Sequence, residues 1–244
     1  MAEDLVDQDF RGGLVREVNF RDARFERVGF RGATMRGVEF NDAQIDGDVE
    51  GLVINGVEVW PLIEAELDRR DPERVKMRPK DADGVRTAWD VVERLWAGTV
   101  ERARQLPEEK LHVRVDGEWS FIQTLRHLVY ATEVWIYRVV QGEPEPWHAL
   151  SLPYDGAKPH PRLPWDLDVQ PSLDEVLAIR HDRMTRVRQY VDQLTDAEFN
   201  SQTTPVEGPS WPPADAYDVK MCLEILLNEE WQHRLYAERD LQLL

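Results

Sequence analysis

The sequence predicts a protein of two parts, a short coil with a five-residue period followed by an all-α bundle of four helices. Large apolar residues recur at every fifth position from Phe10 to Ile45. Four later segments carry apolar residues at the spacing of three and four that is typical of helices. With 244 residues, 42% apolar and 32% charged, the chain has the composition of a globular protein with a buried core.

The five-residue period covers most of the first sixty residues. It fits neither an α-helix nor a strand, and it suits a chain that turns a corner every five residues with its large side chains inside. Blocks such as FRDAR, FERVG and FRGAT resemble the pentapeptide-repeat family. The resemblance implies a short right-handed β-helix over residues 1–60, in which segment 51–60 closes the stack. The periodic residues are Phe10, Val15, Phe20, Phe25, Phe30, Met35, Phe40 and Ile45.

A linker and four helices are expected after the coil. Residues 61–79 form a linker with a short helix that begins at Pro61, a favoured first helical position. The bundle then occupies residues 80–244. Its second and third helices each begin with a capping box, Ser120 with Gln123 and Ser172 with Glu175. The four helices are expected at 82–106, 120–141, 172–194 and from near Asp215 almost to the C-terminus.

Composition excludes several classes of function. A formal net charge of −17 argues against binding to nucleic acid or to an anionic membrane. The single cysteine, Cys222, excludes a disulfide framework, and no stretch reaches the ~18–20 apolar residues of a membrane span. The N-terminus has no basic segment before an apolar run, so we expect a cytoplasmic protein. Arginine far outnumbers lysine, which suggests a GC-rich, actinobacterial genome.

Candidate metal ligands lie on the second and fourth helices. Glu229 and His233 are four residues apart and therefore share one face of a helix, which is the spacing that lets two residues chelate one ion. His127 lies on the second helix between small neighbours. If these helices pack together, two imidazoles and one carboxylate meet and leave an open coordination position. A histidine satisfied by a core hydrogen bond and a plain Glu–His pair are the alternatives.

The segments WSFIQTLRHLVYATEVW and LNEEWQHRLYAERDL resemble helices two and four of the DinB superfamily. The resemblance implies a metal site made by one histidine of helix two and two of helix four. His127 and His233 match this pattern, whereas Glu229 replaces the usual middle histidine. Zinc or nickel is the expected ion. Glu230 is a neighbouring alternative whose helix stripe looks less buried.

The resemblance further implies thiol chemistry. A low-molecular-weight thiol such as mycothiol would bind at the metal and attack a small electrophile, and His148 and His160 in the long loop after helix two would line the substrate site. The second possibility is a non-catalytic scaffold whose coil mediates self-association, for example as a homodimer. A third is a metal-dependent hydrolase, in which metal-bound water replaces the thiolate.

Overall fold

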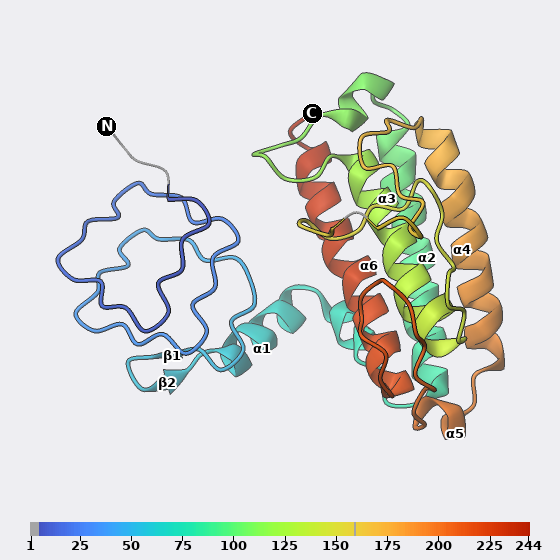
Figure 1. Ribbon diagram of the computed structural model, residues 1–244, viewed down its shortest axis with the longest axis horizontal. Coiled ribbons are helices and arrows are strands. Elements are labelled where there is room, and N and C mark those ends of the chain that lie inside the picture. Colours follow the sequence, from blue (N-terminus) through green and yellow to red (C-terminus); the bar gives the residue numbers. More distant parts are fainter. Residues whose placement is uncertain (1–4, 159) are drawn as a thin grey trace. The chain divides into compact units, whose positions relative to one another are not determined.

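The computed structural model describes residues 5–158 and 160–244. The chain divides into two compact units, one that ends at Asp48 and one from Val49 to Leu244 (Figure 1). The expected boundary at residue 60 falls inside the second unit, because residues 49–60 form local structure. Strands β1 (Val53–Ile54) and β2 (Val57–Glu58) pair in an antiparallel hairpin. Asn55 and Gly56 form its turn with φ of 51° and 82°, as the Asn-Gly dipeptide favours.

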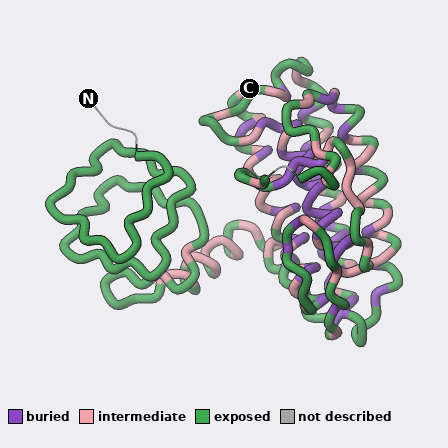
Figure 2. The backbone as a smooth tube through the Cα atoms, viewed as in Figure 1, coloured by how far each residue is buried: buried purple, intermediate pink, exposed green. Residues whose placement is uncertain are grey.

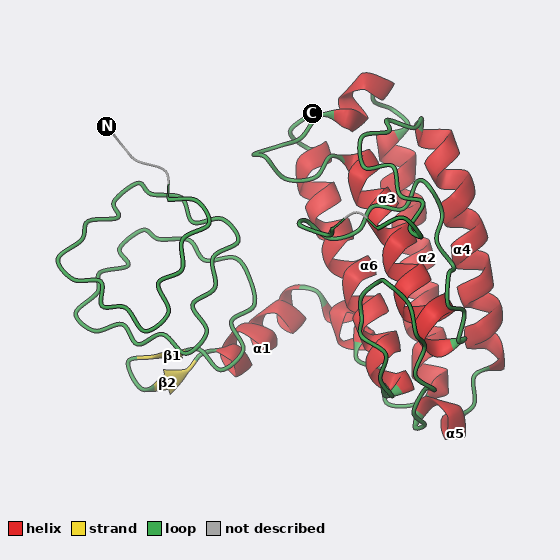
Figure 3. Cartoon of the chain, in the orientation of Figure 1, coloured by secondary structure: helices red, strands yellow, loops and turns green. Residues whose placement is uncertain are grey.

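The first unit changes direction at every fifth residue. Turns in this unit are closed by hydrogen bonds such as that from the Ala23 amide to the Phe20 carbonyl, at 3.0 Å. Over residues 5–48 the structure contains neither helix nor strand (Figure 3), so the predicted β-helix is not observed. The five-residue period is nevertheless present in the backbone. Positive φ occurs at Asp7, Gly12, Glu17, Asp22, Arg27, Gly32, Gly37, Asp42 and Gly47.

The aromatic side chains of this unit do not form the predicted closed core. Phe20, Phe25 and Phe30 are 47%, 52% and 51% exposed. Phe25 contacts both neighbours edge to face, with ring centroids 5.3 Å from Phe20 and 6.0 Å from Phe30. The expectation of buried rings was wrong because stacked repeats are covered only by neighbouring repeats, and so short a coil has few of them. Figure 2 shows residues 5–48 as exposed.

The second unit is helical, as the sequence predicted. Four long helices form its core, and α6 packs against α2, α3 and η3, while α4 packs against α2 and α3 (Figure 1). The long helices are α2 (Ala82–Ala103), α3 (Phe121–Thr132), α4 (Leu173–Gln193) and α6 (Val219–Leu241). The shorter elements are α1 (Trp60–Arg70), η1 (Pro72–Met77), η2 (Glu108–His112), the π-helical η3 (Glu133–Val140) that continues α3, and α5 (Asp196–Phe199).

Both predicted capping boxes are confirmed. Ser120 and Ser172 each accept a hydrogen bond from the backbone of the residue three positions later, and the side chains there reach back to the cap. Helix α6 begins at Val219, later than expected. The Val219 amide donates to the Ser201 carbonyl at 3.0 Å, and the Thr203 amide donates to the Tyr217 carbonyl at 2.8 Å. The residues before Val219 therefore pair with an earlier part of the same connection instead of extending the helix.

The buried side chains of the second unit line the interior of the helical bundle (Figure 2). The largest fully buried apolar ones include Trp89, Leu125 and Leu226. Two long connections, residues 141–172 and 194–218, run along the helices (Figure 3). Among the described residues, no helix combines the length and the apolar character that a membrane crossing requires.

Candidate metal centre

His127, Glu229 and His233 lie together where α3 packs against α6. The Nε2 atom of His127 is 3.4 Å from Oε2 of Glu229, and Nε2 of His233 is 3.0 Å from the same oxygen. One potential ligand atom from each residue lies within 4.8 Å of the others. Two ligands bound at ~2.0–2.1 Å to a tetrahedral ion are about 3.3 Å apart. The spacing of the three side chains therefore fits one divalent ion.

The protonation of His127 is fixed by a backbone carbonyl. Its Nδ1 lies 3.0 Å from the carbonyl oxygen of Leu152, which can only accept a hydrogen bond. The proton of the neutral ring is therefore on Nδ1, and the Nε2 lone pair faces the Glu229 carboxylate. Two acceptors 3.4 Å apart need a cation between them, either a second proton or a metal ion. A histidine whose Nδ1–H is held by a carbonyl is the usual form of a metal-binding imidazole.

Glu229 is charged in this arrangement. Burial raises its pKa, but His127 and His233 lower it to about 2 when their imidazoles are protonated and donate hydrogen bonds to the carboxylate. The site thus offers one negative charge and two imidazoles in a partly buried position, since His127 is only 7% exposed. This donor set suits zinc and other divalent ions that accept nitrogen and oxygen ligands.

The sequence model of the DinB superfamily matches residues 91–237, which include all three residues. This chain belongs to the DinB superfamily. Members of this superfamily often bind a metal ion. The comparisons found no curated protein and no solved structure that matches the chain. The match covers most of the helical bundle, and the coil before it lies outside the matched residues.

Glu230, the alternative ligand, lies on another face of α6 in this DinB domain. Its carboxylate is fully buried and accepts hydrogen bonds from Arg180 on α4 at 2.9 and 3.1 Å. The expectation that its stripe is less buried was wrong, because α6 is surrounded by α2, α3 and η3 and buries a wide arc of its surface. Glu230 therefore balances a core arginine and does not join the group of three.

Cys222 supplies no reactive thiolate in the DinB domain. The side chain is fully buried on α6, and burial together with Asp218 raises the pKa of the thiol to about 12. A thiolate is the nucleophilic form of cysteine, so the residue packs as a small apolar side chain near neutral pH.

Aromatic side chains surround the imidazoles. The Trp119 ring lies 4.4 Å from the His127 ring and 5.8 Å from the His233 ring. Tyr130, one turn after His127, lies 5.8 Å from it and contacts Trp147 and Trp165 of the long loop at 6.0 and 5.4 Å. We call Tyr130, Trp147 and Trp165 the aromatic cluster. The sequence analysis did not identify it, although the loop is visibly rich in tryptophan.

The aromatic cluster carries three buried donors without a hydrogen-bond partner among the described residues. They are the hydroxyl of Tyr130 and the indole nitrogens of Trp147 and Trp165. Buried donors in folded proteins are paired in the great majority of cases, because each unpaired one costs about 1–3 kcal/mol. The three rings contact one another, and Tyr130 also contacts His127, so these donors lie beside the candidate ligands.

The two loop histidines proposed for substrate binding do not join the metal ligands. The His148 Nδ1 accepts a hydrogen bond from the Leu150 amide at 3.1 Å, and its own amide donates to Glu133 at 3.3 Å. His160 is exposed, and its Nδ1 accepts from the Arg162 amide at 3.2 Å. His148 therefore shapes the loop, and no contact connects His160 with the three candidate ligands in the described residues.

Three buried charged residues, Arg126, Arg138 and Glu133, hold the long loops against the DinB bundle. Arg126 and Arg138 point from the second long helix to backbone carbonyls of the loops, and both are 1% exposed. Glu133 accepts hydrogen bonds from Ser151 and from Arg183. Helical periodicity cannot identify such residues. The only signal in the sequence is that they are charged although most of their neighbours in the same helical segment are apolar.

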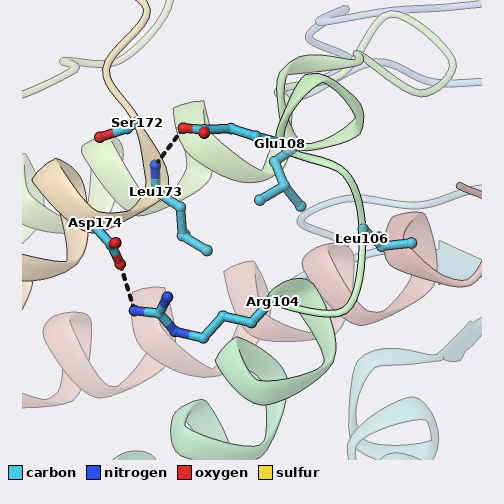
Figure 4. A pocket seen from close by; sticks show the side chains of 7 residues that line it. Arg104, Leu106, Glu108, Ser172, Leu173 and Asp174 are labelled. Atoms are coloured by element: carbon cyan, nitrogen blue, oxygen red, sulfur yellow. Dashed lines mark hydrogen bonds and ion pairs between the residues drawn. The ribbon is translucent and has the colours of Figure 1, made fainter.

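A pocket of about 180 Å³ lies elsewhere in the DinB domain, between the end of α2, η2 and the start of α4. Figure 4 shows that its polar side chains already bind one another. Arg104 pairs with Asp174 at 2.6 Å, and Glu108 accepts from the Leu173 amide at 3.3 Å. None of the three candidate ligands lines it.

Proposed function

We propose that this protein is a metal-dependent enzyme in which His127, Glu229 and His233 hold one divalent ion, with zinc or nickel as the expected metal. The observation that carries the proposal is the tautomer of His127 and the direction of its Nε2 atom. Its Nδ1 proton is committed to the Leu152 carbonyl, so its Nε2 lone pair meets the Glu229 carboxylate and requires a cation. Three protein ligands leave a tetrahedral ion one open position, as in catalytic sites.

The proposed reaction is the transfer of a low-molecular-weight thiol, for which mycothiol is one candidate, to a small electrophile. A bound divalent ion would supply Lewis acidity and lower the pKa of the thiol. The thiol comes from solution, because Cys222 is buried with a pKa raised to about 12. The protein residues hold the ion, exclude water with Trp119, and orient the organic partner through the unpaired donors of the aromatic cluster.

Metal-dependent hydrolysis is the second candidate, and the carboxylate ligand favours it. Glu229 lies within 3.4 Å of both imidazole nitrogens and adds a negative charge to the donor set. A carboxylate-containing set is also found in hydrolytic zinc enzymes, where the activated nucleophile is water. The two candidates share the ligands and differ in the nucleophile.

Elemental analysis tests the shared part of the proposal. Untagged protein, purified without chelator and dialysed against Zn²⁺, should retain about one ion per chain. His233→Ala should lose it, with unchanged helix content by circular dichroism, because the bundle has its own apolar core. The matched control is His181→Ala, which removes an exposed histidine of α4 and should retain the ion. Wild-type protein without metal would refute the proposal.

Cobalt substitution separates the two nucleophiles. If the open position accepts a thiol, 2-mercaptoethanol added to the Co²⁺-loaded protein should produce a sulfur-to-cobalt charge-transfer absorption. His233→Ala should not produce it. A Co²⁺ protein whose spectrum does not respond to the thiol would favour the hydrolase.

A further inference from the structure

Residues 148–158 and 160–169 of the long loop contact α3 on both sides of His127 in the sequence, at Arg126 and at Tyr130. We call this segment the strap. Its Leu152 carbonyl accepts the hydrogen bond from His127 Nδ1 at 3.0 Å, and the Leu152 amide donates to the carbonyl of Arg126 at 3.2 Å. The position of Leu152 therefore decides which nitrogen of His127 is available to a ligand.

The Arg126 side chain binds the strap at both ends. Its guanidinium donates to the carbonyl of Leu150 at 2.8 Å, to that of Val169 at 2.9 Å, and to that of Asp166. The Arg126 residue is only 1% exposed, so its buried charge depends on these carbonyls for hydrogen-bond partners. A guanidinium presents five donors in a fixed plane, and a lysine at this position could not serve three carbonyls in the same way.

A second fastening holds the strap beside Leu152. The Ser151 hydroxyl donates to Glu133 Oε2 at 2.6 Å, and the Glu133 Oε1 accepts from Arg183 of α4 at 2.7 Å. Glu133 and Ser151 are both fully buried. Leu152 is thus held by the side chains of Arg126 and Ser151, whose hydrogen bonds go to the loop and to Glu133 and not to the three candidate ligands.

We propose that the strap is a positioning device for His127, and that Arg126 and Ser151 set the tautomer and the orientation of this imidazole through the Leu152 carbonyl. The inference rests on the proposed metal site for its effect on affinity, but not for its effect on the tautomer. Arg126 and Ser151 are positioning residues, since neither contacts the site. Partners that orient a metal-binding histidine in this way typically change metal affinity by 10–100-fold when they are removed.

The test uses two matched arginines. Arg126→Met and Arg138→Met each remove a fully buried guanidinium that binds loop carbonyls, but Arg138 binds Val206 and Pro212 of the other loop. The Zn²⁺ dissociation constant is measured by competition with a chromophoric chelator in the full-length protein. Arg126→Met should weaken binding 10–100-fold, whereas Arg138→Met should change it less than threefold. Equal losses in the two variants would overturn the proposal, because they would reflect general destabilisation.

Ser151→Ala is the milder variant, in case Arg126→Met does not fold. It removes one hydroxyl next to Leu152 and should weaken Zn²⁺ binding by about threefold to tenfold, with helix content unchanged. An unchanged dissociation constant in Ser151→Ala would overturn this part of the proposal.

The ¹⁵N chemical shifts of His127 give a readout that does not depend on the metal. Metal-free wild type should show the proton on Nδ1, and Arg126→Met or Ser151→Ala should show a mixture of the two tautomers. A wild-type ring with its proton on Nε2 would overturn the inference. If wild type binds no Zn²⁺ but shows the Nδ1 tautomer with loss in the variants, the proposed function fails and the strap inference stands.

Discussion

Glu229 and Glu230 are adjacent in the sequence and have opposite surroundings. Glu229 faces two imidazoles, whereas Glu230 is enclosed in the core with Arg180 at 2.9 Å. Arg180 also lies over the Trp96 ring at 5.1 Å, and the Trp96 indole donates to the Glu230 carbonyl. Successive residues of a helix point about 100° apart. Glu229 therefore faces the candidate ligands His127 and His233, whereas Glu230 faces Arg180 in the core.

Replacing Glu229 by glutamine should therefore reduce Zn²⁺ affinity, whereas replacing Glu230 by glutamine should reduce the stability of the fold. Glu229→Gln should weaken Zn²⁺ binding at least tenfold and change the free energy of unfolding of the metal-free protein by less than about 1 kcal/mol. Glu230→Gln should lower that free energy by roughly 3–5 kcal/mol, because it leaves the Arg180 charge without its partner in the core. Urea denaturation and chelator competition measure the two quantities. Strong Zn²⁺ binding by Glu229→Gln would contradict its role as a ligand.

The π-helical element η3 begins at Glu133, whose carboxylate accepts a hydrogen bond from Ser151 of the strap. An α-helix that continued without this irregularity would place the following side chains in different directions. Burial raises the pKa of Glu133 to about 7, and the hydrogen bonds from Ser151 and Arg183 only partly oppose this effect. The folded protein therefore binds this proton more tightly than the unfolded chain does, for which the pKa is 4.5.

Because the pKa of Glu133 is higher in the folded protein than in the unfolded chain, its contribution to the free energy of unfolding depends on pH. The contribution of Glu133 is complete below about pH 4.5 and is lost as the pH rises through about 7, a loss of roughly 3 kcal/mol at most. Metal-free wild type should thus lose more stability than Glu133→Gln between about pH 5 and pH 8, measured by urea denaturation. Parallel losses in the two proteins would show instead that Arg183 keeps Glu133 ionised throughout.

The two compact units of the whole molecule are expected to unfold separately, since each is an independent set of contacts. A ligand that binds only the folded form of one unit raises the midpoint of that unit alone. In scanning calorimetry, excess Zn²⁺ should raise the transition of the DinB bundle by several degrees and leave the transition of the coil in place. A common shift of both transitions would contradict independent unfolding.

Phe25→Ala tests the same independence by destabilising the coil instead of stabilising the DinB bundle. The ring is 52% exposed but contacts Phe20 and Phe30, so its removal should lower the stability of the coil by about 1–2 kcal/mol, less than the ~3–5 kcal/mol typical of a fully buried ring. Zn²⁺ affinity should not change. A weakened Zn²⁺ affinity in this variant would mean that the coil influences the metal site.

Local sequence rules determined the helical bundle and three candidate ligands. Periodicity places Glu229 and His233 on one face of α6, and capping boxes set the starts of α3 and α4, because these features depend on residues three or four positions apart. The five-residue period likewise appears in the backbone of the coil. Its predicted strands and closed core do not, because burial depends on how many windings cover one another.

Tertiary structure alone decided what surrounds the ligands. The carbonyls of Leu150 and Leu152 and the rings of Trp147 and Trp165 all belong to a loop without periodicity, so no spacing in the sequence relates them to His127. The same holds for Glu230, whose partner Arg180 is 50 positions away in the chain. Contacts between distant residues depend on packing of the complete fold, and these contacts turn three suitable side chains into an oriented site.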